Sequence, residues 1–172
     1  MRFKTLLVMA ILIIISASFA KEARIAYFDS NKLQGEWNDW KDAQAKFDQE
    51  MLKWQQDALE LEEELTQLME DYQRQELLLS DDKKQEKEML IQQKQAEYQE
   101  FLASIYSENG IAFQRNAELT APLFEKISIA LSKIAERDGY SVVFDAASTG
   151  IAYIDPALDI TEELIEELQS TR

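Results

Sequence analysis

Apolar residues recur at alternating spacings of four and three along a long segment near the N-terminus. Glu36–Asn109 contains 74 residues without Gly or Pro. A period of 3.5 residues indicates a helix that supercoils against a partner. From Leu33 to Leu79 this helix would be roughly 70 Å long, too long for a compact domain of this size, so we predict a projecting arm. The repeat consists of Leu33, Trp40, Phe47, Trp54, Leu61 and Leu68, with Trp37, Gln44, Met51, Ala58, Leu65, Tyr72 and Leu79.

The same period continues after a polar segment and predicts a returning helix. Ser80–Lys83 has the composition of a turn, with Asp82 and Gln85 as a possible capping pair. Two long helices joined by a short turn form an antiparallel hairpin. Gly110 interrupts the returning helix, either as a hinge or as a glycine tolerated where helices pack closely. The returning repeat is Ile91, Tyr98, Ile105, Ala112 and Leu119, with weaker companions at Lys94, Leu102, Asn109 and Asn116.

Short strand and helix patterns flank the hairpin on both sides. A strand is predicted at residues 24–28, and Asp29-Ser30-Asn31 can cap the helix that follows. Pro122 is expected to open an amphipathic helix that ends at Gly139. Residues 140–144 and 151–154 are predicted to pair as a β-hairpin. Asp159 or Thr161 would cap a last helix. The apolar stripes of these helices are Leu123, Ile127, Leu131 and Ile134, then Leu164, Ile165 and Leu168.

These elements predict an α+β fold in which a small body carries a long helical arm. The body comprises residues 21–32 and 119–172, and the hairpin arm comprises residues 33–118. A body of about 66 residues without disulfides would be marginally stable alone, and its strands would expose edges. We therefore predict self-association through the body. The side chains expected at this contact are Ile25, Tyr27, Val142, Phe144, Ile151 and Tyr153.

The first 20 residues have the pattern of a cleaved secretory signal. Arg2 and Lys4 precede the apolar run Leu6–Ile15, and Ser18-Phe19-Ala20 matches a small-x-small cleavage site. We predict cleavage after Ala20, with an uncleaved anchor as the alternative. The apolar run is short for a bilayer span, and the chain has no Cys for a lipid anchor.

Charge and composition exclude several classes of function. The chain carries 18 bases and 33 acids, a net charge of −15, and without residues 1–20 the net charge is −17. This balance argues against nucleic acids and against anionic membrane surfaces as partners. With no His and no Cys, neither a Ser–His nor a Cys–His nucleophile can exist. Acid runs such as Glu62–Glu64 fit a solvated helix face better than a catalytic or metal site, so no enzyme activity, cofactor or metal is predicted.

The order of elements behind a signal peptide resembles the Skp/OmpH family of periplasmic chaperones. The resemblance spans the whole mature chain. The arm is matched only by length and pattern, because any coiled hairpin would look alike there. The segments that carry the resemblance are Arg24–Asp29, Leu131–Asp145, Ile151–Ile154 and Asp159–Leu164.

The resemblance implies a jellyfish-like homotrimer whose tentacles enclose unfolded outer-membrane proteins without using ATP. One property departs from the family. Its best-known members have basic tentacles, and some are proposed to bind lipopolysaccharide through basic residues. Residues 36–116 of this chain hold 9 bases and 20 acids. We therefore do not extend lipopolysaccharide binding to this chain. The acidic arm would serve repulsion between tentacles, solubility or basic clients.

Aromatic residues in the arm are the candidates for contact with clients. Hairpin packing is the simpler interpretation for the tryptophans, whereas Phe101 and Tyr106 lie off the main seam and are favoured as client-facing. The full candidate set is Trp37, Trp40, Trp54, Tyr98, Phe101 and Tyr106. The alternative function is a structural spacer or adaptor of the cell envelope whose arm binds one folded partner.

Overall fold

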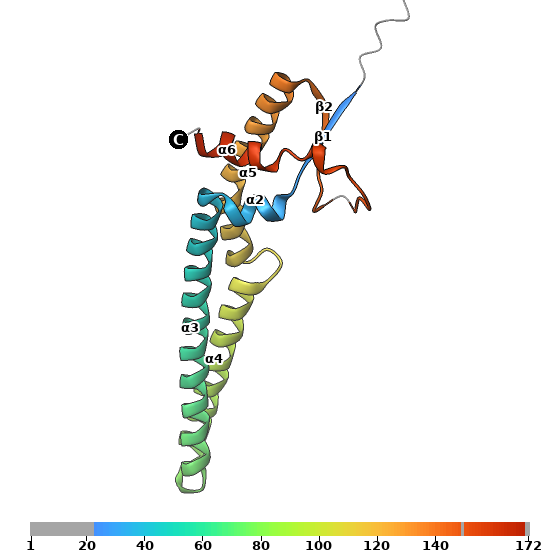
Figure 1. The fold of residues 1–172 in the computed structure, drawn as a ribbon. Helices are drawn as coiled ribbons and strands as arrows, with labels where there is room; N and C mark the ends of the chain where they lie inside the picture. The colour runs from blue at the N-terminus through green and yellow to red at the C-terminus, as the bar shows by residue number, and fades with distance from the viewer. Residues whose placement is uncertain (1–22, 149, 171–172) are drawn as a thin grey trace, which may run out of the picture.

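A computed structural model describes residues 23–148 and 150–170 of the chain. The expected signal peptide, residues 1–20, lies outside the described residues. A long helical arm hangs from a small body that holds both strands and the last helix (Figure 1). The elements in chain order are β1 (Arg24–Phe28), α2 (Ser30–Glu36), α3 (Asn38–Gln75), the 3-10 helix η2 (Glu76–Leu78), α4 (Asp81–Tyr106), α5 (Ile111–Asp138), β2 (Tyr140–Asp145), the 3-10 helix η3 (Pro156–Leu158) and α6 (Thr161–Ser170).

The sheet of the body consists of β1 and β2 paired in parallel. In this register Ile25 lies opposite Val142 and Tyr27 lies opposite Phe144. The prediction of a β-hairpin between residues 140–144 and 151–154 is wrong, because no strand forms at 151–154. The carbonyl of Tyr27 instead accepts a hydrogen bond from the amide of Ile160 at 2.9 Å. The segment before α6 therefore runs along the second edge of β1, and not beside β2, with which residues 151–154 were predicted to pair.

The hydrophobic core lies where α2, α5 and α6 meet β1. Asp29 caps α2 by accepting from the amides of Asn31 and Lys32, as predicted. Its own amide donates to the hydroxyl of Thr161, which is fully buried at the start of α6. Each fully buried aliphatic side chain contributes about 1.5–3 kcal/mol to the body. The core residues are Ala26, Phe28, Leu33, Trp37, Leu123, Ile127, Ala130, Ile134, Ile160, Leu164, Ile165 and Leu168.

The first helix of the predicted arm is broken at Trp37. This residue is extended, with φ −76° and ψ 121°, and it separates α2 from α3. Its side chain is 1% exposed and belongs to the core of the body. The prediction of one helix from Leu33 to Leu79 is therefore wrong at both ends. The 38 residues of α3 span about 57 Å.

The turn at the tip of the arm comes earlier than the sequence predicts. It consists of η2 and Leu79, and Ser80 is the N-cap of α4 without a side-chain capping bond. Asp81 and Asp82 fall in the first turn of α4, where negative charge is favourable. The predicted turn at Ser80–Lys83 and the Asp82–Gln85 capping pair are therefore wrong.

The returning branch is also divided into two helices. α4 ends at Tyr106, and α5 begins at Ile111 after the break Ser107–Gly110, the yellow loop of Figure 1. The prediction that Pro122 opens a helix is wrong, because Pro122 lies inside α5. Thus α5 runs from the arm into the body, and the predicted boundary at residues 118 and 119 falls within one continuous helix. Gly139 ends α5 in the left-handed region, with φ 73°, as the sequence predicts.

Candidate functional site

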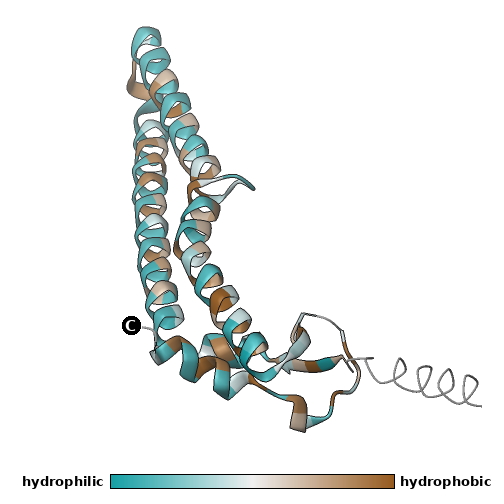
Figure 2. Cartoon of the chain, turned by 90° about the horizontal axis from the view of Figure 1, so that it is seen from above, coloured by the Kyte–Doolittle hydropathy of each residue, from teal (hydrophilic) through white to brown (hydrophobic). Residues whose placement is uncertain are grey.

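The two branches of the arm meet along the predicted apolar seam. In α3 the seam residues Ala58, Leu61 and Leu65 are buried or half-buried, and in α4 Ile105 is 2% exposed. Two of the weak positions on the returning branch do not belong to the seam, because Asn109 and Asn116 are exposed. The predicted hairpin is confirmed, and its pairing is antiparallel (Figures 1 and 2).

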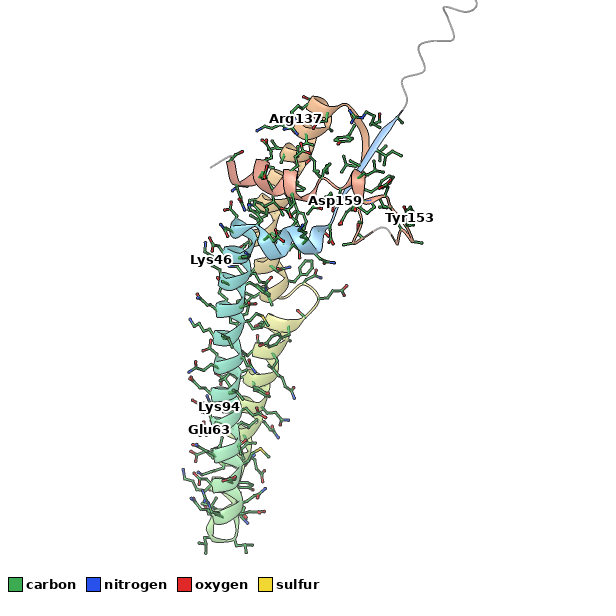
Figure 3. All side chains as sticks on the ribbon, in the orientation of Figure 1. Lys46, Glu63, Lys94, Arg137, Tyr153 and Asp159 are labelled. Carbon is green, nitrogen blue, oxygen red and sulfur yellow. The ribbon has the colours of Figure 1, made fainter. Side chains whose placement is uncertain are left out.

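Charged groups tie the branches together beside the seam. The ammonium of Lys94 lies 2.9 Å from a carboxylate oxygen of Glu64 and 3.1 Å from one of Glu97 (Figure 3). Lys126 of α5 lies 2.6 Å from Asp39 at the base of α3. The charge of Lys94, at a polar position of the predicted seam, is therefore paired with carboxylates of both branches.

Arg115 and Glu50 form the most extensive of these contacts. The guanidinium Nε lies 2.8 Å from Oε2 of Glu50, and Nη2 lies 2.8 Å from Oε1. The third nitrogen, Nη1, lies 3.0 Å from a carboxylate oxygen of Glu118. Hydrogen bonding to Arg115 lowers the pKa of the Glu50 carboxyl below its ordinary value. Bidentate pairs of this kind fix orientation as well as distance.

The pairing of the two branches changes at the break. Lys94 faces Glu64, so an unbroken helix would place residue 108 opposite Glu50, which lies fourteen residues earlier in α3. The residue that pairs with Glu50 is instead Arg115, which comes seven residues after residue 108 in the sequence. The break at Ser107–Gly110 therefore removes about two helical turns from the seam. The loop protrudes from the arm in both views (Figures 1 and 2).

A tyrosine anchors the seam near the tip. The hydroxyl of Tyr72 donates to Oε1 of Glu88 at 2.5 Å, from α3 to α4. This hydrogen bond to a carboxylate, with some desolvation, raises the pKa of Tyr72 to about 12. The neutral hydroxyl is thus the form that holds the last turns of the branches together.

The structure divides the predicted client-contact residues into three groups. Trp37 is wrong as a candidate, because it is enclosed in the core of the body. Trp40 packs edge-on against Phe124 at a centroid distance of 5.6 Å, and Trp54 and Tyr98 are half-buried in the seam. Phe101 is half-buried, whereas Tyr106 is 45% exposed at the end of α4. Contact with clients stays a prediction for all five remaining residues.

Several exposed apolar residues of the arm were not singled out from the sequence. Leu77 and Leu78 at the tip are 93% and 87% exposed. Ile111 and Phe113, 46% and 60% exposed, follow the break in the sequence, and Tyr106 precedes it. All of them could have been identified from the sequence, because each is an apolar residue outside the heptad positions of the seam. The exposed apolar set on the arm is Leu52, Leu59, Met69, Leu77, Leu78, Met89, Leu90, Tyr106, Ile111 and Phe113.

The body exposes apolar side chains around its small sheet. Ile25 and Val142 are 45% and 42% exposed, and Tyr153 projects from the far end of the body with 81% exposure (Figure 3). A groove of about 230 Å³ runs between β1 and the segment that contains Ile151 and Tyr153, with Tyr27 and Phe144 in its wall. The six residues predicted for self-association therefore lie around one region of the body. Their role in assembly stays a prediction.

Neither a metal site nor a membrane span is present in the described part of the chain. No group of three or more acidic side chains in residues 23–148 and 150–170 could hold an ion. Within the same residues, no helix is both long enough and apolar enough to cross a bilayer.

A small α+β body carrying a helical hairpin about 57 Å long is a fold found among known proteins. The family model described as outer membrane protein (OmpH-like) matches residues 24–168. The chain therefore belongs to the OmpH-like family. No curated protein matches this sequence significantly. A similar solved structure is that of a protein from Caulobacter crescentus CB15, provisionally assigned as an OmpH-like outer membrane chaperone. The two chains align with a TM-score of 0.74 and 13% identity, over 87% of this chain and 86% of that one.

Proposed function

We propose that this protein is an ATP-independent holdase chaperone of the periplasm that binds unfolded outer-membrane β-barrel proteins and prevents their aggregation. The observation that carries the proposal is the projecting arm with its exposed apolar side chains. Membership of the OmpH-like family supports a chaperone role. Export by the N-terminal signal, with cleavage after Ala20, would place the protein in the periplasm.

The contacts available on the arm suit an unfolded client. An unfolded β-barrel protein exposes alternating apolar residues and aromatic girdles, which aggregate in water. Scattered leucines, methionines and aromatic residues on the arm can contact such segments weakly at many points. Several arms acting together would give high avidity without one fixed pose. Release would follow transfer of the client to a stronger acceptor.

Assembly as a homotrimer is part of the proposal. The exposed residues around the sheet and the groove beside Ile151 supply an apolar surface that self-association would cover. Three copies joined at their bodies would hold three arms around one client.

Light scattering of a refolding outer-membrane β-barrel protein tests the function. We expect a stoichiometric amount of this protein to suppress aggregation, and we expect suppression to remain at high salt if apolar contact dominates. The absence of suppression at every salt concentration would contradict the proposal and favour a structural spacer that binds one folded partner. Binding that saturates with a single folded protein would support that alternative directly.

A further inference from the structure

One side of α3 carries apolar residues that the hairpin does not use. Leu52 and Leu59 lie seven residues apart outside the seam and are 64% and 58% exposed. Met69, 43% exposed, does not continue this line, because it lies ten residues after Leu59 and lines a groove between α3 and α4 with Glu88 and Ile91. On a supercoiled helix a spacing of seven keeps residues on one line. We call this surface the outer stripe, and define it as Leu52 and Leu59 with the neighbouring acids Asp48, Glu62 and Glu63.

The carboxylates of the outer stripe form no ion pair among the residues that the structure describes. Asp48 and Glu63 accept hydrogen bonds from the neutral amides of Gln44 and Gln67, at 2.8 and 3.1 Å. In the described part of the chain, no Lys or Arg forms an ion pair with Asp48, Glu62 or Glu63. All three side chains are exposed. Glu63 directly precedes Glu64, the partner of Lys94, and therefore lies about 100° around α3 from it.

The bases nearest to Leu52 and Leu59 are placed on other sides of the arm. Lys94, Arg115 and Lys126 are held in ion pairs with α3, at Glu64, Glu50 and Asp39. Lys53 follows Leu52 directly and therefore lies about 100° around the helix from it, and Lys46 shares the position of Lys53 one heptad earlier. Lys41 lies one heptad before Asp48 and lines a groove with it, at the end of the outer stripe nearest the body. Around Leu52 and Leu59 the hairpin thus leaves the outer stripe apolar and negative.

We propose that the outer stripe is a docking surface for unfolded segments rich in both apolar residues and lysine or arginine. The apolar stem of a bound lysine would pack on Leu52 or Leu59 while its ammonium reaches a neighbouring carboxylate. An acidic segment with the same apolar content would be repelled. The inference rests on the proposed chaperone function and specifies the class of client that this arm selects.

Two fluorescent peptides of identical apolar sequence test the selectivity, one with lysine and the other with glutamate at every polar position. Fluorescence anisotropy with the intact protein should show that the lysine peptide binds about tenfold or more tightly than the glutamate peptide at low salt. The difference should shrink as added salt screens the exposed charges.

Matched variants locate the site on the arm. The double variant Leu52→Gln/Leu59→Gln should weaken binding of the lysine peptide severalfold, whereas Met89→Gln/Leu90→Gln, which removes exposed apolar groups from α4, should not. Glu62→Gln/Glu63→Gln should weaken binding more than Glu100→Gln/Glu108→Gln, which removes the same charge from exposed positions of the returning branch. Circular dichroism checks that each variant retains its helices.

Equal affinity for the two peptides, or equal losses in the test and control variants, would overturn the inference. Failure of both peptides to bind would overturn it as well. Each of these results is compatible with suppression of aggregation by other surfaces of the arm. The proposed function itself fails only if the light-scattering experiment shows no suppression of any client.

Discussion

The guanidinium of Arg115 donates hydrogen bonds to both carboxylate oxygens of Glu50. This contact joins α5 to α3 on the body side of the break in the returning branch. We expect Arg115→Gln to lower the melting temperature and to loosen the upper arm, because the bidentate contact is lost. Arg74→Gln is the matched control, since Arg74 pairs with Asp71 inside α3 and joins no second helix. Thermal unfolding measured by circular dichroism compares them, and equal effects would contradict the bridging role.

The Arg115–Glu50 contact should also contribute to the pH dependence of stability. The pKa of Glu50 is lowered in the folded protein by its hydrogen bonds to Arg115. The contribution is therefore present above the ordinary glutamate pKa of about 4.3 and is lost as the pH falls through the depressed value. We expect the difference in melting temperature between the wild type and Arg115→Gln to shrink below that pH. A difference that stays constant into strong acid would be incompatible with this account.

Gly110 is required at the break because of space. Its φ of −70° is available to any residue, but an added Cβ would lie 2.5 Å from the backbone oxygen of Ile105. We expect Gly110→Ala to destabilise the protein by about 1–3 kcal/mol, since backbone must move. Gly35→Ala is the control: a Cβ there meets nothing within 4 Å, and alanine should stabilise helix α2 by up to about 1 kcal/mol. Urea unfolding measures both changes. The hinge role of Gly110 stays a separate prediction.

Tyr72 should titrate later than an ordinary tyrosine. Its hydrogen bond to Glu88 raises its pKa to about 12, so the stabilising contact is complete below the ordinary pKa of about 10 and is lost as the pH rises through about 12. We expect Glu88→Gln to bring this pKa down. Carbon NMR of labelled tyrosine can follow it, with the resonance assigned by its absence in Tyr72→Phe. An unchanged titration in Glu88→Gln would refute the assigned cause.

Trp37 should behave as a core residue of the body. Its side chain is 1% exposed, and Trp37→Ala would leave a large cavity that costs about 3–5 kcal/mol. Trp54→Ala, at a half-buried position of the seam, should cost less. Chemical denaturation followed by far-ultraviolet circular dichroism gives both values. A larger loss for Trp54→Ala would mean that the arm seam, and not the body core, is the more sensitive region.

Charge placed on the exposed face of the sheet should dissociate the proposed trimer. Val142 is 42% exposed on β2, and a lysine there would bury an unpaired charge in any interface that covers the sheet. We expect Val142→Lys to shift sedimentation toward the monomer. Ile129→Lys, at a 50% exposed position of α5, is the control. A trimer that survives Val142→Lys would place the subunit contact elsewhere.

Local patterns in the sequence were sufficient for the hairpin of the arm and for three helix boundaries of the body. The heptad spacing from Phe47 to Tyr72 predicts the seam because burial follows the period of a helix directly. Asp29, Gly139 and Asp159 were predicted as helix boundaries and act as such, since capping depends on a few neighbouring residues. The family resemblance came from the same local segments and is confirmed.

The tertiary structure decided features for which the sequence pattern fits more than one arrangement of the chain. Seven residues are about two helical turns, so the break at Ser107–Gly110 shifts the pairing of the branches while Ile105 and Ala112 keep their heptad phase. Trp37 also occupies a heptad position, but its side chain is buried in the core of the body, and the helix is broken at this residue. The sheet pairs β1 with β2 across more than 100 residues, and the amide of Ile160 takes the carbonyl of Tyr27 on the second edge of β1. In each case the deciding contact is distant in sequence, because burial and backbone hydrogen bonds are satisfied only once the chain is folded.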